Sequence, residues 1–183
     1  TQSDLARAAV VAGAAVRGFA LDASETQRVV DVMAVAFTSS ALDIEKFQTS
    51  MTKVAPIAAA ADISLESTTA VMGTLTDAGI EASIAGTSLR NIFLKMQDPA
   101  SDLSRHLGFT VENTDDLEKA LTQLNDEGLS NAEMMELVDL RQVAAFQTMV
   151  NGTVSILDMT DALEDSNGEA QKMADIMADT LEG

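Results

Sequence analysis

Apolar residues return along most of the chain at steps of three and four positions, which is the spacing of one buried face of an α-helix. Polar residues fill the positions between them. Only residues 109–112 have a weak strand pattern, too short to indicate a sheet. The clearest helical runs are Phe47, Met51, Val54 and Ala58; Leu89, Ile92, Phe93 and Met96; and Leu117, Leu121 and Leu124.

Short polar residues and one proline mark where these helices begin or bend. Ser24, Asp43 and either Asp62 or Ser64 are predicted N-caps, because a short side-chain oxygen accepts a hydrogen bond from the free amides of the first turn, and a further helix is predicted to begin at Ser83. Pro56 has no amide hydrogen, so it is predicted to kink its helix or to begin a new one.

Two glycines carry conformational information. Gly79 follows Asp77 and Ala78, where a helix that ends needs a left-handed residue. Gly86 lies inside the next helix, where glycine costs about 1 kcal/mol relative to alanine. We therefore expect a neighbouring backbone to lie against Gly86.

The predicted fold class is all-α. Alanine, leucine, methionine and glutamate are frequent and only two prolines occur in 183 residues, so we expect a compact bundle of roughly 8–10 helices with short loops and no significant sheet. Aromatic residues make up 3% of the chain. A core of alanine, methionine and aliphatic residues buries little area per helix, which predicts modest stability.

The formal net charge is −18, from 29 acidic and 11 basic residues. This balance argues against specific nucleic-acid binding, because phosphate contacts need clustered lysine and arginine. The absence of cysteine excludes disulfides and thiolate sites. The most apolar stretch, Leu5 to Leu21, contains Arg7 and Arg17, so membrane contact by this stretch stays open but unsupported.

The residues that carry chemistry do not form a recognisable site. His106 is the single histidine and has neither a catalytic partner nor a second metal ligand at helical spacing, so it is predicted to face solvent or be hydrogen-bonded. The carboxylate pairs Asp115-Asp116 and Asp126-Glu127 lie where a helix begins or ends, and capping explains them. We expect no enzyme, no catalytic residue, no cofactor and no metal.

The region from residue 54 to residue 90 resembles the phage tail tape measure proteins of the TP901 type. That family has an Ala-Pro-Ile/Val-Ala kink, a Ser-Leu-Glu cap, an Ala-Gly-Ile turn and an Ala-Gly-Thr-Ala-Leu-Arg helix. This chain matches them in order at 54–60, 64–66, 78–80 and 85–90, with Ser88 where the family often has alanine. The structural motif consists of Pro56, Gly79, Gly86, Thr87, Leu89 and Arg90.

The resemblance extends from about residue 17 to about residue 150. It divides the chain into a tape-measure-like helical domain, residues 1–150, and a C-terminal helical extension, residues 151–183, that packs on it or leads to the next region. Since tape measure proteins are much longer and the chain starts at Thr1, we expect a fragment of a longer protein.

The resemblance implies a structural component of a phage or prophage tail. Such a protein fills the tail lumen, sets tail length during assembly and is released ahead of DNA. It would be made in the bacterial cytoplasm and reside in the virion tail, with the tail tube protein, tail assembly chaperones and other copies of itself as partners, the last as a homo-oligomer. A generic bacterial helical interaction module or a secreted effector would share the composition but not the pattern from Pro56 to Arg90.

Overall fold

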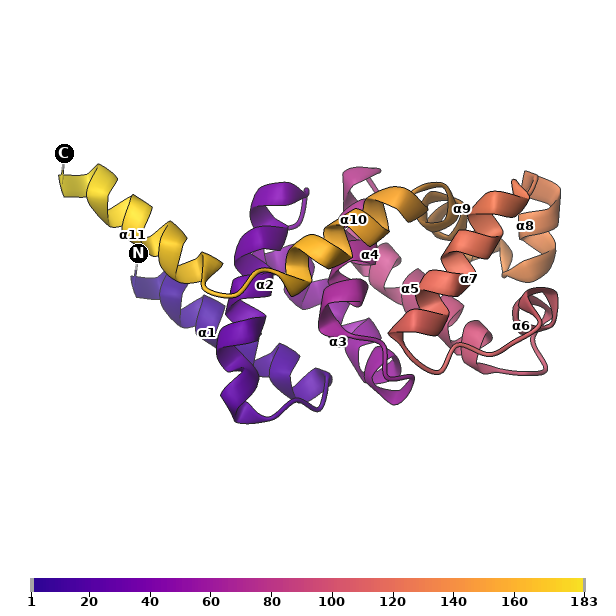
Figure 1. Ribbon diagram of the computed structural model, residues 1–183, viewed down its shortest axis with the longest axis horizontal. Coiled ribbons are helices and arrows are strands. Elements are labelled where there is room, and N and C mark those ends of the chain that lie inside the picture. The colour runs from indigo at the N-terminus through magenta and orange to yellow at the C-terminus, as the bar shows by residue number, and fades with distance from the viewer. Residues whose placement is uncertain (1, 183) are drawn as a thin grey trace.

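The computed structural model describes residues 2–182. Within that range it contains eleven α-helices, two short 3-10 helices and no strand (Figure 1), which confirms the all-α prediction and exceeds the expected number of helices by one. The α-helices are α1 (Gln2–Gly18), α2 (Thr26–Ser39), α3 (Ile44–Ala60), α4 (Leu65–Asp77), α5 (Ala82–Gln97), α6 (Asp102–Leu107), α7 (Thr114–Glu127), α8 (Asn131–Leu137), α9 (Val143–Asn151), α10 (Thr153–Glu164) and α11 (Glu169–Glu182). The 3-10 helices are η1 (Ala23–Glu25) and η2 (Leu140–Gln142).

The predicted N-cap Asp43 is confirmed, and of the two alternatives Asp62 and Ser64 the cap is Ser64. The side chain of Asp43 accepts a hydrogen bond from the amide of Lys46, and Ser64 accepts one from the amide of Ser67. The prediction for Ser24 was wrong by two residues, because the carboxylate of Asp22 accepts from its amide. Helix α5 begins one residue before Ser83, and the carboxylate of Glu81 accepts from the amide of this serine. A carboxylate two positions earlier competes successfully with the serine hydroxyl for the role of cap.

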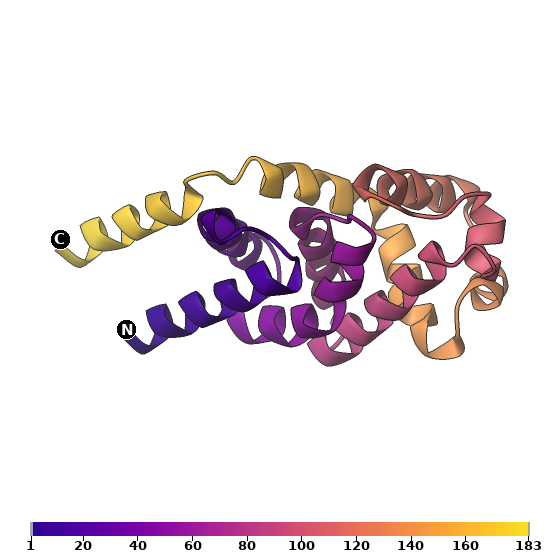
Figure 2. The same ribbon diagram turned by 90° about the horizontal axis from the view of Figure 1, so that it is seen from below.

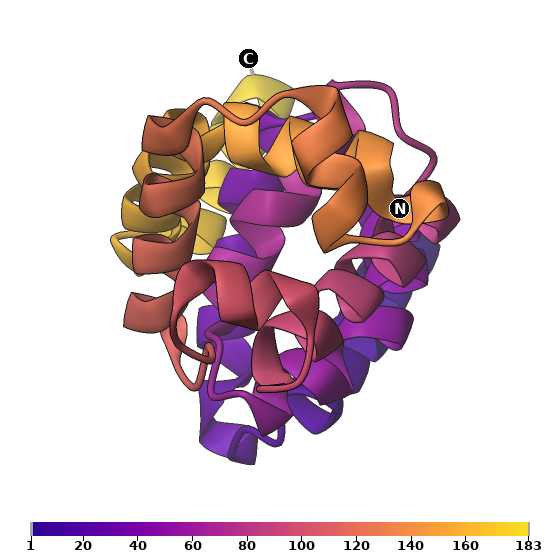
Figure 3. The same cartoon turned by 90° about the vertical axis from the view of Figure 1, so that its right-hand side faces the viewer.

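Helix α4 is the centre of the bundle. It packs against α3, α5, α9, α10 and α2, and Figure 3 looks along the long axis with α4 among these surrounding helices. The polar side chains Thr68 and Thr76 of α4 are buried. The hydroxyl of Thr68 donates a hydrogen bond to the carbonyl of Ser64, and the hydroxyl of Thr76 donates one to the carbonyl of Met72. These bonds within the helix satisfy hydroxyls that would otherwise be costly to bury.

Helix α3 lies between α1 and α5 and forms one long side of the molecule with them. Helices α10 and α7 lie on the opposite side, as Figure 2 shows. The core between the two sides includes the fully buried rings of Phe47, Phe93 and Phe146. The start of α1 and helix α11 project at the same end of the molecule, where both termini lie (Figures 1 and 2).

A buried ion pair joins α2 to α4. Glu66 is 3% exposed, and both of its carboxylate oxygens accept hydrogen bonds from Arg28, at 2.6 Å from Nε and 2.8 Å from a terminal nitrogen. Glu25 pairs with the same guanidinium at 3.2 Å. The hydrogen bonds to Glu66 raise the pKa of Arg28 above its usual range, so the guanidinium is charged throughout the neutral pH range.

The C-terminal helices are held by specific contacts. Helix α10 packs on α4 and α2, burying Ile156 and Leu163. Asp31 of α2 is 2% exposed, and its two oxygens accept hydrogen bonds from the amides of Gly168 and Ala170, each at 3.0 Å. Asp31 therefore supplies the N-cap of α11 from a distant helix. The division at residues 150 and 151 stays a prediction.

Replacing Asp31 with alanine is expected to lower the free energy of unfolding by about 1–2 kcal/mol, because two amides at the start of α11 lose their acceptor. Hydrogen exchange of the α11 amides should accelerate more than exchange elsewhere. The matched control is Asp175→Ala, which removes an exposed carboxylate bonded only to Gln171 within α11. Equal protection of α11 in both variants would refute the capping role.

Candidate functional site

The predicted close approach at Gly86 is confirmed. A Cβ atom built on Gly86 would lie 2.8 Å from Cα and 2.9 Å from the carbonyl oxygen of Ser50, both in the backbone of α3. Real Cβ atoms do not approach a backbone so closely, so only glycine allows α5 to lie this near to α3. Leu89, one turn later, is fully buried in the core.

The structure brings three motif residues, Pro56, Thr87 and Arg90, together in one groove between α3 and α5. Lys53 crosses this groove, and its ammonium group donates to the hydroxyls of Ser83, at 2.5 Å, and Thr87, at 3.1 Å. Lys53 is half-buried, and α5 supplies its ammonium group with hydroxyl acceptors. The complete lining is Thr52, Lys53, Pro56, Ile57, Thr87 and Arg90.

Pro56 lies inside α3, whose helix continues to Ala60. A new helix does not begin at Pro56, so of the two predicted outcomes only a bend within one helix remains open. Thr52 and Pro56 form a ridge, because they also line a second groove, on the side of α3 that faces α1.

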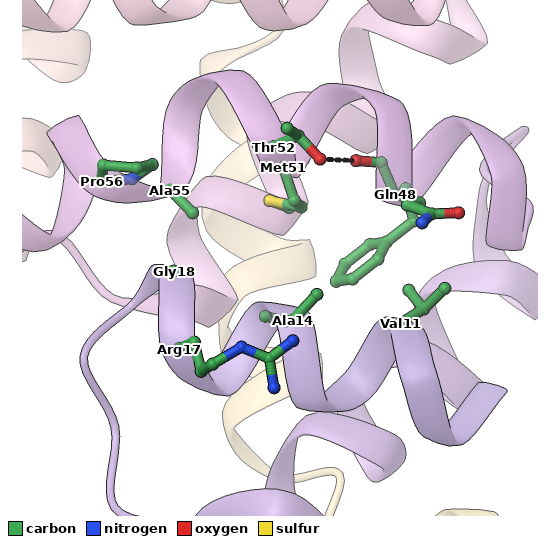
Figure 4. Close-up of a pocket in the computed structure, with 11 residues that line it drawn as sticks. Val11, Ala14, Arg17, Gly18, Gln48, Met51, Thr52, Ala55 and Pro56 are labelled. Atoms are coloured by element: carbon green, nitrogen blue, oxygen red, sulfur yellow. Dashed lines mark hydrogen bonds between the residues drawn. The ribbon is translucent and has the colours of Figure 1, made fainter. Parts of the chain in front are cut away.

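The second groove encloses about 220 Å³. Figure 4 shows α1 facing α3 across it, with Val11, Ala14 and Arg17 on one wall and Gln48 and Met51 on the other. The two helices are in close contact at Gly18, where an added Cβ would lie 3.0 Å from Cβ of Ala55.

A third groove continues the surface beyond α5. It shares Thr87 with the first groove and extends to η2, where Leu140 and Arg141 lie. Leu140 is 75% exposed, and Ile84 on the α5 wall is 56% exposed. We call the three connected grooves, which cross α1, α3, α5 and η2, the groove face.

Gly79 lies outside the groove face. It ends α4 with a φ of +83°, and nothing lies within 4 Å of the position that its Cβ would occupy. The prediction of a left-handed helix end is confirmed. Gly79 is thus required for its backbone conformation, and Gly86 for the space that it leaves to a neighbour.

The titratable groups fit structural roles. His106 shares a hydrogen bond of 2.5 Å with Glu127, and this bond holds the pKa of Glu127 below its ordinary value. Asp115 and Asp116 lie in the first turn of α7, and Asp126 and Glu127 lie at its end, as predicted, but capping does not explain them, because Asn113 caps the start of α7 and Gly128 its end. Among residues 2–182 no group of three or more histidine, cysteine, aspartate or glutamate side chains could hold a metal ion.

A cluster of carboxylates on α7 and α10 consists of Asp115, Glu118, Asp161, Glu164 and Asp165. Partial burial raises the pKa of Glu118, and the charges of Glu164, Asp115 and Asp161 add to the increase. Partial burial likewise raises the pKa of Glu164, where Glu66, Asp161 and Asp165 add to it and Arg28 opposes it. The acidic cluster therefore holds crowded negative charge at neutral pH.

The acidic cluster predicts that stability falls as the pH rises from about 4.5, the ordinary pKa of glutamate, toward neutrality. A carboxyl group whose pKa is raised in the folded state binds protons more tightly there, so its stabilising contribution is complete below the unfolded pKa and is lost above the folded one. Glu118→Gln/Glu164→Gln should raise the melting temperature at pH 7 more than at pH 4.5. Glu112→Gln/Asp126→Asn, a control with the same change of charge, should not show this difference.

Several residues of the groove face were not predicted from the sequence. Ser50, which receives Gly86, is one small residue among many in an amphipathic helix, and no local signal distinguishes it. From the sequence, Arg17 was interpreted only as a charge that interrupts an apolar stretch. Gly13 lies four residues before Arg17 and therefore on the same helix face, which was a local signal for the position of the Arg17 side chain. Leu140 and Arg141 join the face only through the packing of η2 on α5.

No helix among residues 2–182 is both long enough and apolar enough to cross a lipid bilayer. Membrane contact by residues 5–21 thus gains no support from the helix that contains most of them.

The chain is similar to two curated proteins that are both named as tape measure proteins. The chain is 31% identical over 196 residues to the tape measure protein of Pneumococcus phage Dp-1, covering 97% of this chain and 17% of that protein. It is 26% identical over 182 residues to the probable tape measure protein of Escherichia phage P2, covering 90% of this chain and 22% of that protein. The chain thus spans less than a quarter of the length of these curated relatives. No solved structure matches it.

The family model of the phage-related minor tail proteins matches residues 1–140. This match covers the whole motif from Pro56 to Arg90 and most of the described helices, and with the two tape measure relatives it confirms the resemblance inferred from the sequence. The chain belongs to the family of phage-related minor tail proteins.

Proposed function

We propose that this chain is a folded structural segment of a tail tape measure protein. The observation that carries the proposal is the similarity of nearly the whole chain to two proteins named as tape measure proteins. In this role the parent protein fills the tail lumen, sets tail length during assembly and leaves ahead of the DNA. Its partners would be the tail tube protein, assembly chaperones and other copies of itself.

A structural role rather than catalysis is supported by where the polar residues lie. Asn113 caps α7 and the carboxylates lie in its first and last turns, His106 is bonded to Glu127, and Glu66 is bonded to Arg28. The grooves of the groove face are lined by alanine, threonine, methionine and isolated cations, without a paired acid and base. We propose that the chain is not an enzyme.

The folded shape indicates that this segment does not act as the ruler. As one continuous helix, 183 residues would extend about 275 Å at about 1.5 Å per residue. The chain instead folds back on itself through eleven helices. The length of the tail would then depend on other parts of the parent protein.

In-frame deletion of residues 1–183 from the parent gene tests this role. Tail lengths are measured by electron microscopy, and deletion of an equal length from a long helical region elsewhere in the same protein serves as the matched control. We expect the control deletion to shorten the tail in proportion. Deletion of this segment should instead stop tail assembly or leave tail length unchanged. Assembled tails shortened in proportion to the missing residues would contradict the proposal.

The proposed exit through a narrow tube requires a domain that unfolds readily. The structure agrees with this requirement, because the core contains only three fully buried aromatic rings and relies on alanine, methionine and aliphatic side chains. Unfolding of the purified domain by force should thus occur well below the force that opens a β-sandwich of similar size. Comparable mechanical resistance would contradict this part of the proposal.

A further inference from the structure

The basic residues fall into two groups by their partners. Six form ion pairs with carboxylates, and Lys119 lies over the ring of Phe109 at 4.4 Å. The remaining four have no carboxylate within ion-pair distance anywhere in the part of the chain that the structure describes. The paired residues are Arg7, Arg28, Lys46, Lys95, Arg105 and Lys172. The unpaired ones are Arg17, Lys53, Arg90 and Arg141.

All four unpaired cations line the groove face. Acidic residues outnumber basic ones by 29 to 11 in this chain, so a cation on an average surface has many carboxylates to pair with. The lining of the three grooves includes a single carboxylate, Asp139, and Lys95 holds it at 3.5 Å. The groove face is therefore a cationic surface on an otherwise acidic molecule.

The opposite side of the molecule carries the complementary charge. Helices α7 and α10 lie across the body from α1, α3 and α5 in Figure 2, and they hold the acidic cluster defined above. Within residues 2–182 no cation forms an ion pair with any of its five carboxylates. Val154, on the same helix as Asp161 and Glu164, is 65% exposed and adds an apolar contact.

We propose that the groove face of one copy docks on the acidic cluster of a second copy. Each surface holds charges that form no ion pair within the described part of the monomer, and each would supply the opposite charge that the other lacks. Ile84 and Leu140 would meet apolar surface such as Val154, so the contact combines apolar burial with opposite charges. Because the two surfaces lie on opposite sides, each added copy leaves both kinds of surface free at the ends.

A second copy fits the groove face better than nucleic acid does. Four cations spread over three grooves do not form the dense basic stripe that neutralises successive phosphates. A long polyanion would also meet the net charge of −18 on the rest of the molecule, whereas a second copy presents its carboxylates in one compact patch. A second copy as partner rests on the proposed tail role, in which other copies of the chain are partners. The self-association can nevertheless be measured on the purified chain, outside a tail.

Two charge-reversal variants test the docking. The face variant carries Arg17→Glu/Arg90→Glu/Arg141→Glu and keeps Lys53, which braces α3 against α5. The cluster variant carries Glu118→Lys/Asp161→Lys/Glu164→Lys. Circular dichroism first checks that both are folded. Sedimentation velocity over a concentration series then compares each variant, their equimolar mixture and the unaltered chain.

The unaltered chain should grow beyond a dimer as its concentration rises, and either variant alone should associate at least about tenfold more weakly, as expected for three exposed ion pairs replaced by repulsion. Their mixture should associate again, because one intact surface of each kind remains and the two reversed surfaces also carry opposite charges. A control with the same change of charge at paired cations, Arg7→Glu/Arg105→Glu/Lys172→Glu, should associate like the unaltered chain.

A chain that stays monomeric throughout, or variants that remain monomers when mixed, would overturn the inference. So would binding of duplex DNA by the unaltered chain that the face variant loses, if it occurs without self-association. None of these results would change the outcome of the gene deletion, so the docking and the tape measure role fail separately.

Discussion

Valine in place of Gly86 is expected to destabilise the protein by about 3 kcal/mol or more, since an overpacked contact between two backbones cannot be relieved by a side-chain rotation. The Cβ atom alone would overlap Cα and the carbonyl oxygen of Ser50, so α5 must move away from α3. For a chain of this size the melting temperature should fall by about 6–12 °C. Thermal unfolding followed by circular dichroism measures it.

Two other glycines serve as controls. Gly13→Val introduces a Cβ whose nearest neighbour is the flexible end of Arg17 at 3.5 Å, and stability should change by no more than about 0.5 kcal/mol. Gly79→Val should lose about 1–2 kcal/mol, because a branched residue is strained at positive φ although space is available. If Gly86→Val proved no worse than Gly13→Val, the packing of α3 on α5 would be wrong.

Arg28→Met should lower the free energy of unfolding by about 3 kcal/mol, because it leaves the carboxylate of Glu66 buried without its partner. This value lies at the low end of the range for broken buried pairs, because 38% of the Arg28 side chain is exposed. Glu164 lies near enough to Glu66 for the two carboxylates to repel each other. The charge of Arg28 now offsets this repulsion, and the substitution would remove that charge. Urea unfolding at pH 7 measures the loss.

The double variant Arg28→Met/Glu66→Leu completes the test. Replacing both members of a buried pair by apolar groups of similar size removes the stranded charge, so most of the stability should return. Arg105→Met, which breaks an exposed pair with Asp102, should change stability by less than about 1 kcal/mol. A double variant no more stable than Arg28→Met would place the effect in packing and not in charge.

Sequence reasoning succeeded where a single residue type answers a local requirement. Gly79 was predicted to adopt a left-handed conformation and does, because few other residues tolerate positive φ. Leu89 was placed in the core by its spacing from Ile92, Phe93 and Met96, all of which are fully buried. The family was identified from the order of such local features between Pro56 and Arg90, and the family match confirms it.

The features that sequence reasoning missed depend on contacts between distant helices. Asp31 looks like any polar residue on an amphipathic helix, yet it caps α11 more than 130 residues later. Lys53 lies on the polar face of its helix, and α5 brings two hydroxyls to its ammonium group. Such partners come from tertiary packing, and no short-range pattern encodes them.

The grouping of unpaired cations is a further case of the same kind. Arg17, Lys53, Arg90 and Arg141 are spread over 125 positions of a chain whose net charge is strongly negative, and the total charge predicts a uniformly acidic surface. The packing of α1, α3, α5 and η2 collects them on one face. Net charge therefore predicts the average surface and not its local sign.

We propose that this chain, a member of a phage tail protein family, leaves the tail ahead of the DNA as part of its parent protein. Quantitative mass spectrometry of purified virions, before and after triggered DNA ejection, tests it most directly. Peptides from residues 1–183 should be present in intact virions in a fixed ratio to the tail tube protein and should be depleted from empty tails. Their absence from intact virions, or their undiminished presence in empty tails, would contradict the account.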